Sequence, residues 1–137
     1  MEDVPEWAEW LIKELIETLE LLAAPAERQE AYQIEHRVPV DELPMLLQDL
    51  TYAITDHRSG SMPGQLERSG RLRTDQVDAI AALWSQFEAM LPDNSVWEDE
   101  AIFSRPEWVE VRRLAAEALR LLGDARTGSG EQAPKRD

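Results

Sequence analysis

Cysteine is absent from the 137-residue chain. Its absence excludes thiol catalysis, disulfide cross-links and the cysteine-based zinc sites that stabilise many small domains. Histidine occurs only as His36 and His57, and both are expected at helix ends, where a protonated imidazole complements the helix dipole. No serine stands in a Gly-x-Ser-x-Gly context, and no glycine-rich run has the spacing of a phosphate-binding loop. The sequence therefore lacks the usual signatures of hydrolases and nucleotide-binding proteins, and we expect no cofactor.

Long hydrophobic runs are also missing from the chain. No stretch approaches the roughly 20 apolar residues that a membrane-spanning helix needs. The chain begins Met1-Glu2-Asp3, whereas a secretory signal begins with basic residues and continues with an apolar run. We therefore expect a cytoplasmic protein that has no membrane partner. Twelve of the fourteen basic residues are arginine, which is typical of proteins from high-GC bacterial genomes.

Positive charge is scarce, because 28 acidic residues stand against 14 basic ones and leave a net charge of −14. A surface with this charge repels nucleic acids and anionic membranes and attracts basic proteins. Four arginines, Arg58, Arg68, Arg71 and Arg73, gather in the glycine-containing segment 57–74. We expect them to pair with carboxylates of the same chain, since they form a weak footprint for nucleic acid. The composition predicts a basic protein partner and no nucleic acid.

Apolar residues recur with the helical period throughout the chain, and no stretch alternates with period two. This pattern predicts an all-α fold, a compact bundle of four or five main helices. A single domain is expected over residues 1–124, followed by a disordered tail over 125–137 that lacks large apolar residues. Segment 57–74 is expected to be a long glycine-rich loop, shortened by one helical turn near residues 65–68. The main helices are expected over residues 3–24, 26–35, 41–54, 74–91 and 104–123.

Helix ends are predicted from residues that cap backbone groups. Asp3, Asp41, Thr74 and Ser104 each precede an apolar helical pattern and are the expected N-caps. Gly123 follows the last apolar pattern and is the expected left-handed terminator. On the helices, Trp10 and Trp84 are assigned to the buried stripes, and the second helix is expected to pack through Ala31, Tyr32 and Ile34.

One segment between the last two long helices is typical of a binding surface. Trp97 stands there beside three consecutive acids, Glu98, Asp99 and Glu100, and Asp93 precedes them. Large aromatic side chains are frequent anchors in interfaces, and carboxylates steer a basic partner toward them. These five residues are the predicted partner-binding site. The alternative is that the Trp97 ring plugs the bundle while the three acids begin a short helix.

Paired acids on helices carry a second hypothesis. Glu27 with Glu30, and Asp75 with Asp78, each have the i, i+3 spacing that places two carboxylates on one helix face. These pairs resemble the acidic helix pairs of all-α nucleoside triphosphate pyrophosphatases, which use Mg²⁺. That family has glutamate first in its second pair and a shorter separation between the pairs. The resemblance implies a magnesium-dependent enzyme with these four residues as ligands.

The stretch Leu91…Trp97-x-x-x-Ala101…Trp108-x-x-Val111-Arg112-x-Leu114-Ala115 carries another resemblance. It is similar to the C-terminal part of small helical actinobacterial proteins, and it covers under a quarter of the chain. Some acidic helical proteins of this size are immunity proteins that neutralise toxins. The resemblance and the charge together favour an acidic protein-binding module, an immunity or antitoxin-type inhibitor of a basic toxin. A regulatory scaffold without a toxin is the further alternative.

Overall fold

The computed structural model describes residues 4–129, and the side chains of residues 4–123. All regular structure in this part of the chain is helical, which confirms the all-α fold class. None of its helices has both the length and the apolar character to cross a membrane. The α-helices are α1 (Ala8–Ala23), α2 (Ala26–His36), α3 (Glu42–Thr51), α4 (Met62–Arg68), α5 (Thr74–Met90), α6 (Ala101–Ser104) and α7 (Pro106–Ser129), and the 3-10 helices are η1 (Arg58–Gly60) and η2 (Asn94–Trp97).

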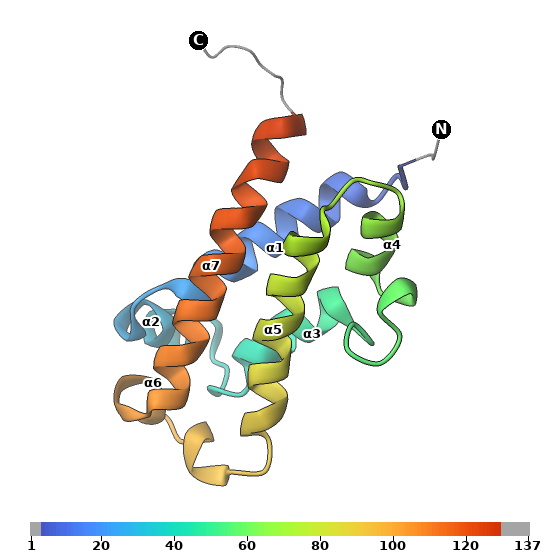
Figure 1. The fold of residues 1–137 in the computed structure, drawn as a ribbon. Coiled ribbons are helices and arrows are strands. Elements are labelled where there is room, and N and C mark those ends of the chain that lie inside the picture. The colour runs from blue at the N-terminus through green and yellow to red at the C-terminus, as the bar shows by residue number, and fades with distance from the viewer. Residues whose placement is uncertain (1–3, 130–137) are drawn as a thin grey trace.

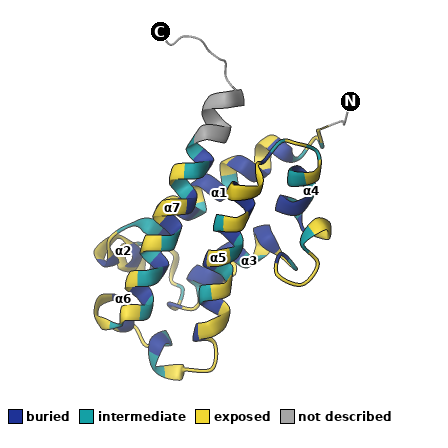
Figure 2. Ribbon diagram, viewed as in Figure 1, coloured by how far each residue is buried: buried dark blue, intermediate teal, exposed yellow. Residues whose placement is uncertain are grey.

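Three long helices build the centre of the fold. Helix α7 packs against both α1 and α5, and α3 closes the core against α1 and α5 (Figure 1). The dark faces in Figure 2 show that the buried residues of these helices turn toward one another. At the base of the core, the fully buried rings of Trp108 and Phe87 meet edge to face, with centroids 5.9 Å apart. The helical period predicted this core, because an apolar stripe on one helix is shielded from water only when it packs against neighbouring helices.

Helix α1 follows its predicted stripe except at one position. Leu11, Leu15 and Leu19 have no exposed surface, whereas Trp10 is 50% exposed. Trp10 is one helical turn from Lys13 and two turns from Glu17, and both of these side chains are exposed. The assignment of Trp10 to the buried arc was therefore wrong, because its position on the helix belongs to the solvent face.

Helix α2 packs on the core through Tyr32, as expected, but its other expected contacts, Ala31 and Ile34, are exposed and buried amides take their place. Ile34 is 70% exposed, and Gln29 is fully buried. The Gln29 amide donates to the carbonyl oxygens of Leu21 and Leu22 at 3.3 and 3.1 Å, and its oxygen accepts from Arg112 at 3.1 Å. The last carbonyls of a helix lack donors within that helix. The need to satisfy the end of α1 therefore decides which face of α2 is buried.

The predicted helix caps differ from those in the structure. Asp3 lies outside the described residues, and Asp41 precedes α3 without a capping hydrogen bond. Thr74 is the first residue of α5, and the N–H before it donates to the Gln76 amide oxygen at 2.6 Å. Ser104 is the last residue of α6, so it does not cap α7. The predictions at Asp41, Thr74 and Ser104 placed a helix boundary near the right position, but other side chains and backbone groups satisfy the exposed N–H groups there. The predicted start of the first helix at Asp3 was wrong, because α1 begins at Ala8.

Segment 57–74 is largely helical, so the prediction of a long loop was wrong, although the helical turn predicted near residues 65–68 is part of α4. It contains η1 and α4. The Ser61 hydroxyl caps α4 by accepting from the Gly64 N–H at 3.0 Å. Gly70, with φ of 81°, ends the helix: its N–H donates to the Glu67 carbonyl, and the next N–H donates to the Leu66 carbonyl. This pair of bonds is a Schellman motif, which satisfies the terminal carbonyls of a short helix.

Helix α7 continues past its predicted end. Gly123 lies within the helix, which extends to Ser129. Residues 125–129, predicted to be disordered, are therefore helical, and residues 130–137 of the predicted tail lie outside the described part of the chain. Glycine ends a helix only where the chain adopts the left-handed conformation and turns away. Gly70 is the described glycine with positive φ, so Gly123 is not a terminator.

Candidate functional site

Trp97 of η2 has two roles in the structure. Its indole N–H donates to the Met90 carbonyl at 3.2 Å, and its ring meets Trp108 edge to face at 5.9 Å. The ring is half-buried, and it also lines an open hollow against α3. The alternative in which Trp97 packs onto the core thus describes most of its contacts, while one side of the ring remains open to a ligand.

Asp93, also a predicted site residue, is held by groups of the same chain. It accepts hydrogen bonds from the hydroxyl and the N–H of Ser95 at 2.6 and 3.0 Å, and it pairs with Arg105 at 3.2 Å. The bonds from Ser95, followed by the charge of Arg105, hold the pKa of Asp93 below its usual range. Its carboxylate orders the turn between α5 and η2, so less of it is free for a partner.

The three acids after Trp97 are exposed and precede α6, as the alternative described. Asp99 lines a separate hollow of about 310 Å³ against α2, together with Glu30 and the buried Gln33. Trp97 does not line that hollow. The structure therefore directs Trp97 and Asp99 to different depressions, although they are two residues apart.

The four acids of the magnesium hypothesis are not brought together. Within the described residues, no group of three histidine, aspartate or glutamate side chains is placed to hold a metal ion. Asp78 accepts from Arg58 at 2.6 Å, and Asp75 from Arg73 at 3.0 Å. The second acidic pair is thus engaged by arginines of the same chain.

Three of the four arginines of segment 57–74 make the expected pairs with carboxylates of the same chain, whereas Arg68 donates to the Ser59 carbonyl at 3.2 Å. Arg58 forms a two-bond pair with Glu67 at 2.9 and 2.7 Å in addition to its contact with Asp78. Arg71 pairs with Glu9 of α1. The Arg58 guanidinium holds the pKa of Glu67 below its usual range. These pairs fasten η1 and α4 to their neighbours and neutralise most of the positive charge on this segment.

A groove lies between α3 and α5. Its larger part, which we call the Trp97 hollow, has a volume of about 630 Å³, and its smaller part, the Tyr52 hollow, has about 320 Å³. The two hollows share Gln48 and Trp84 and therefore adjoin, and we call them together the α3–α5 groove. The Trp97 hollow is lined by Asp41, Glu42, Pro44, Met45, Gln48, Trp84, Phe87, Leu91 and Trp97, and the Tyr52 hollow by Gln48, Tyr52, Ala53, Thr55, Asp56, His57, Trp84 and Glu88.

Helical spacing explains which side chains face this groove. Met45, Gln48 and Tyr52 form one i, i+3, i+7 stripe along α3. Trp84 and Glu88 form the facing i, i+4 stripe of α5. The residues of α3 and α5 that face α1 and α7 are buried in the core. The stripes named above lie on the outer side of the two helices and form the walls of the groove. Trp84, assigned to the buried stripe from sequence, lies at the border between core and groove.

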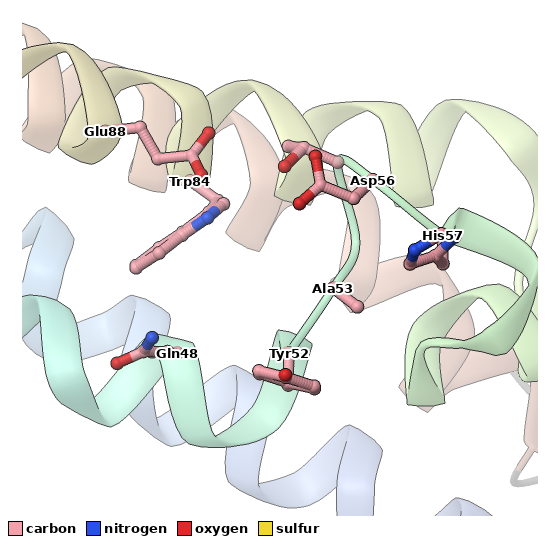
Figure 3. A pocket seen from close by; sticks show the side chains of 8 residues that line it. Gln48, Tyr52, Ala53, Asp56, His57, Trp84 and Glu88 are labelled. Atoms are coloured by element: carbon pink, nitrogen blue, oxygen red, sulfur yellow. The ribbon is translucent and has the colours of Figure 1, made fainter.

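A strained turn forms one end of the Tyr52 hollow. After α3 the chain makes a type II turn, in which the Ile54 N–H donates to the Thr51 carbonyl at 2.8 Å. Ala53 occupies the position of this turn that favours glycine, with φ of 67°. Ile54, predicted to be helical, leaves the helix and is 1% exposed, so its burial holds the turn. The turn sets Asp56 at the rim of the hollow (Figure 3).

The charge of the groove is not neutralised by the protein itself. Asp41, Glu42, Asp56 and Glu88 line it, and within the described residues none has a cationic nitrogen within 4.0 Å. Large apolar side chains beside these acids are open to solvent: Met45 is 46% exposed, Leu91 60% and Tyr52 76%. An aromatic and apolar surface with an acidic rim is suited to a ligand that has both apolar and cationic groups.

Comparison of the chain with protein-family models, curated proteins and solved structures gives no match. Sequence reasoning found Trp97 but missed the rest of the groove. The available signal was the pair of large apolar residues outside the core stripes, Met45 and Tyr52. Leu91 fits the buried stripe expected for the fourth helix, but α5 ends at Met90 and Leu91 is 60% exposed, so its assignment to the core was wrong.

Proposed function

We propose that the protein is an acidic protein-binding module that receives a basic partner in the α3–α5 groove. The observation that carries this proposal is that four carboxylates border an open aromatic groove without a cation of their own. Elsewhere three arginines of the basic segment 57–74, Arg58, Arg71 and Arg73, are paired with carboxylates of the same chain. The groove is thus a place where incoming positive charge gains new partners.

The net charge of −14 favours fast association with such a partner. Long-range attraction increases the rate of encounter, and apolar anchors in the groove then slow dissociation. Glu98, Asp99 and Glu100 follow Trp97 in the chain, are exposed, and add to the negative field that attracts the partner, although none of them lines the groove. The predicted partner-binding residues therefore contribute in two ways, Trp97 as an anchor and the acids by steering.

The most specific form of this proposal is an immunity or antitoxin-type inhibitor that acts in the cytoplasm. Toxins that act on nucleic acids carry positive clefts for their anionic substrates. An acidic protein that occupies such a cleft competes directly with the substrate. A regulatory scaffold would use the same groove without inhibiting an enzyme, so an inhibition assay separates the two proposals.

The experiment uses a basic toxin-like protein encoded next to this chain's gene and measures surface-plasmon kinetics at two salt concentrations. Each of three variants replaces three carboxylates by amides and changes the net charge equally. The groove variant is Glu42→Gln, Asp56→Asn and Glu88→Gln, the acid-stretch variant is Glu98→Gln, Asp99→Asn and Glu100→Gln, and the control is Glu6→Gln, Glu20→Gln and Glu35→Gln.

We expect the groove variant to have the lowest association rate and the flattest salt dependence, because its acids contact the partner. The association rate of the acid-stretch variant should fall less, and that of the control should fall only as much as its lower net charge requires. Circular dichroism first establishes that all variants are folded. If the groove variant and the control have equal association rates at low salt, the partner does not bind in the groove. Binding without inhibition of the toxin would support the scaffold.

A further inference from the structure

The Tyr52 hollow has the size and walls of a side-chain pocket. Its volume of about 320 Å³ is at the lower end of the roughly 300–1,000 Å³ range of ligand pockets. Figure 3 shows the Trp84 indole projecting from α5 on the side of Gln48 of α3, while Tyr52 stands just after the end of α3. Trp84 is half-buried, so part of its ring remains available within the hollow.

Two carboxylates complete the hollow. Glu88 is one turn after Trp84 on α5, and Asp56 comes from the turn that follows α3. In Figure 3 the Asp56 carboxylate points from this turn toward Trp84. Neither acid has a cationic nitrogen within 4.0 Å, and the Gln48 amide makes no hydrogen bond to the described residues. The hollow thus combines an aromatic face with free acceptors.

These groups select the chemistry of an occupant. An apolar side chain would desolvate both carboxylates without replacing their water, and an anion would be repelled. An ammonium group satisfies one carboxylate as a compact charge. A guanidinium is planar, stacks on an indole and presents several donors in one plane, so it is suited to Trp84 and to both acids at once.

We propose that the Tyr52 hollow is an anchor pocket for an arginine side chain of the partner. This inference rests on the proposed function and names the group that the groove recognises. The guanidinium stacks on Trp84 and donates to Asp56 and Glu88, while the apolar part of the side chain passes Tyr52. The Trp97 hollow then receives the residues of the partner that flank this arginine.

The test titrates the folded, ¹⁵N-labelled chain with the acetylated amides of arginine, lysine and citrulline. Citrulline has nearly the shape of arginine without its charge. The readout is the indole N–H resonance of Trp84 in nuclear magnetic resonance spectra, assigned by its loss in Trp84→Phe. We expect a saturable shift with arginine amide, weaker binding of lysine amide and no saturable shift with citrulline amide.

A pair of matched variants locates the charge. Asp56→Asn with Glu88→Gln should weaken the binding of arginine amide by about tenfold, because charge-assisted hydrogen bonds are lost. Asp49→Asn with Glu20→Gln removes the same charge from exposed positions outside the hollow and should leave the affinity nearly unchanged. The dispersion of the backbone resonances confirms that both variants are folded.

Several results would overturn the assignment: no shift of Trp84 with arginine amide, equal binding of lysine or citrulline amide, or equal weakening in the control pair. Such a failure is distinct from failure of the proposed function. If arginine amide does not bind but the groove variant still slows association with the protein partner, the partner occupies the groove through other groups. If arginine amide binds but no basic protein does, the pocket stands and the proposed function is wrong.

Discussion

Replacing Gly64 by alanine is a sharp test of how segment 57–74 is packed. A Cβ atom at this position would lie 1.6 Å from the carbonyl oxygen of Arg58 and 2.6 Å from its carbonyl carbon. Both are backbone atoms, so η1 must move away from α4. Gly123 is the matched control, because it also lies in a helix and a Cβ there meets nothing within 4 Å.

The two substitutions should change stability in opposite directions. Alanine is favoured over glycine by about 1 kcal/mol inside a helix, and for Gly123→Ala this is the whole effect. For Gly64→Ala, forcing an extra methyl into a packed contact costs about 1–3 kcal/mol. Displacing η1 also disturbs the Ser61 cap, whose hydroxyl donates to the Arg58 carbonyl at 2.7 Å, at a cost of about 1 kcal/mol. The net expectation is a loss of about 1–3 kcal/mol.

Urea denaturation followed by circular dichroism measures both changes. We expect the midpoint of Gly64→Ala to fall and that of Gly123→Ala to rise. Helix propensity alone predicts that Gly64→Ala raises stability, and only the contact between η1 and α4 turns this gain into a loss. If Gly64→Ala is as stable as the unmodified protein, η1 does not pack against α4 as described.

Three further predictions concern particular contacts. Arg58 holds the pKa of Glu67 low, so its stabilisation is complete above the ordinary glutamate pKa of about 4.3 and is lost as pH falls through the folded-state value. The melting temperature of Glu67→Gln should therefore fall less steeply than that of the unmodified protein between about pH 5 and 3; equal slopes would contradict this pairing. Ala53→Gly should stabilise the protein by about 0.5–1 kcal/mol in urea denaturation, because glycine adopts positive φ without strain, and a loss of stability would refute the turn. Trp97→Ala should cost about 2–4 kcal/mol in the same assay because it removes the ring that packs on Trp108, and a change below about 1 kcal/mol would place Trp97 outside the core.

The sequence by itself determined the fold class and the core. Leu11, Ile80 and Trp108 are all fully buried, and each belongs to a stripe with the helical period. This part was predictable because a helix with one apolar face must bury that face, whatever its neighbours are. The acidic character of the surface was likewise determined by composition alone.

Local competition among polar groups decided what the helical period does not encode. Gln29 is buried because its amide reaches the carbonyls at the end of α1. Position 64 of α4 holds a glycine where the Arg58 carbonyl of η1 comes too close for a Cβ atom. In both cases the partner group lies outside the residue's own helix. The glycines of segment 57–74 therefore predicted a loop there, and the helical spacing of apolar residues predicted a contact face on α2 in which only Tyr32 packs on the core.

Only the tertiary structure decided the candidate site. Trp97 was recognised from its acidic neighbours, but the structure joins it to a groove whose walls are the outer stripes of α3 and α5. Asp56 and Glu88 line one hollow with Trp84 because α3 and α5 pack against each other and the chain turns sharply after α3 at Ala53, which has a positive φ. A sequence specifies which face each helix buries. Which exposed faces lie opposite each other depends on how the helices pack, and that is settled by the core as a whole.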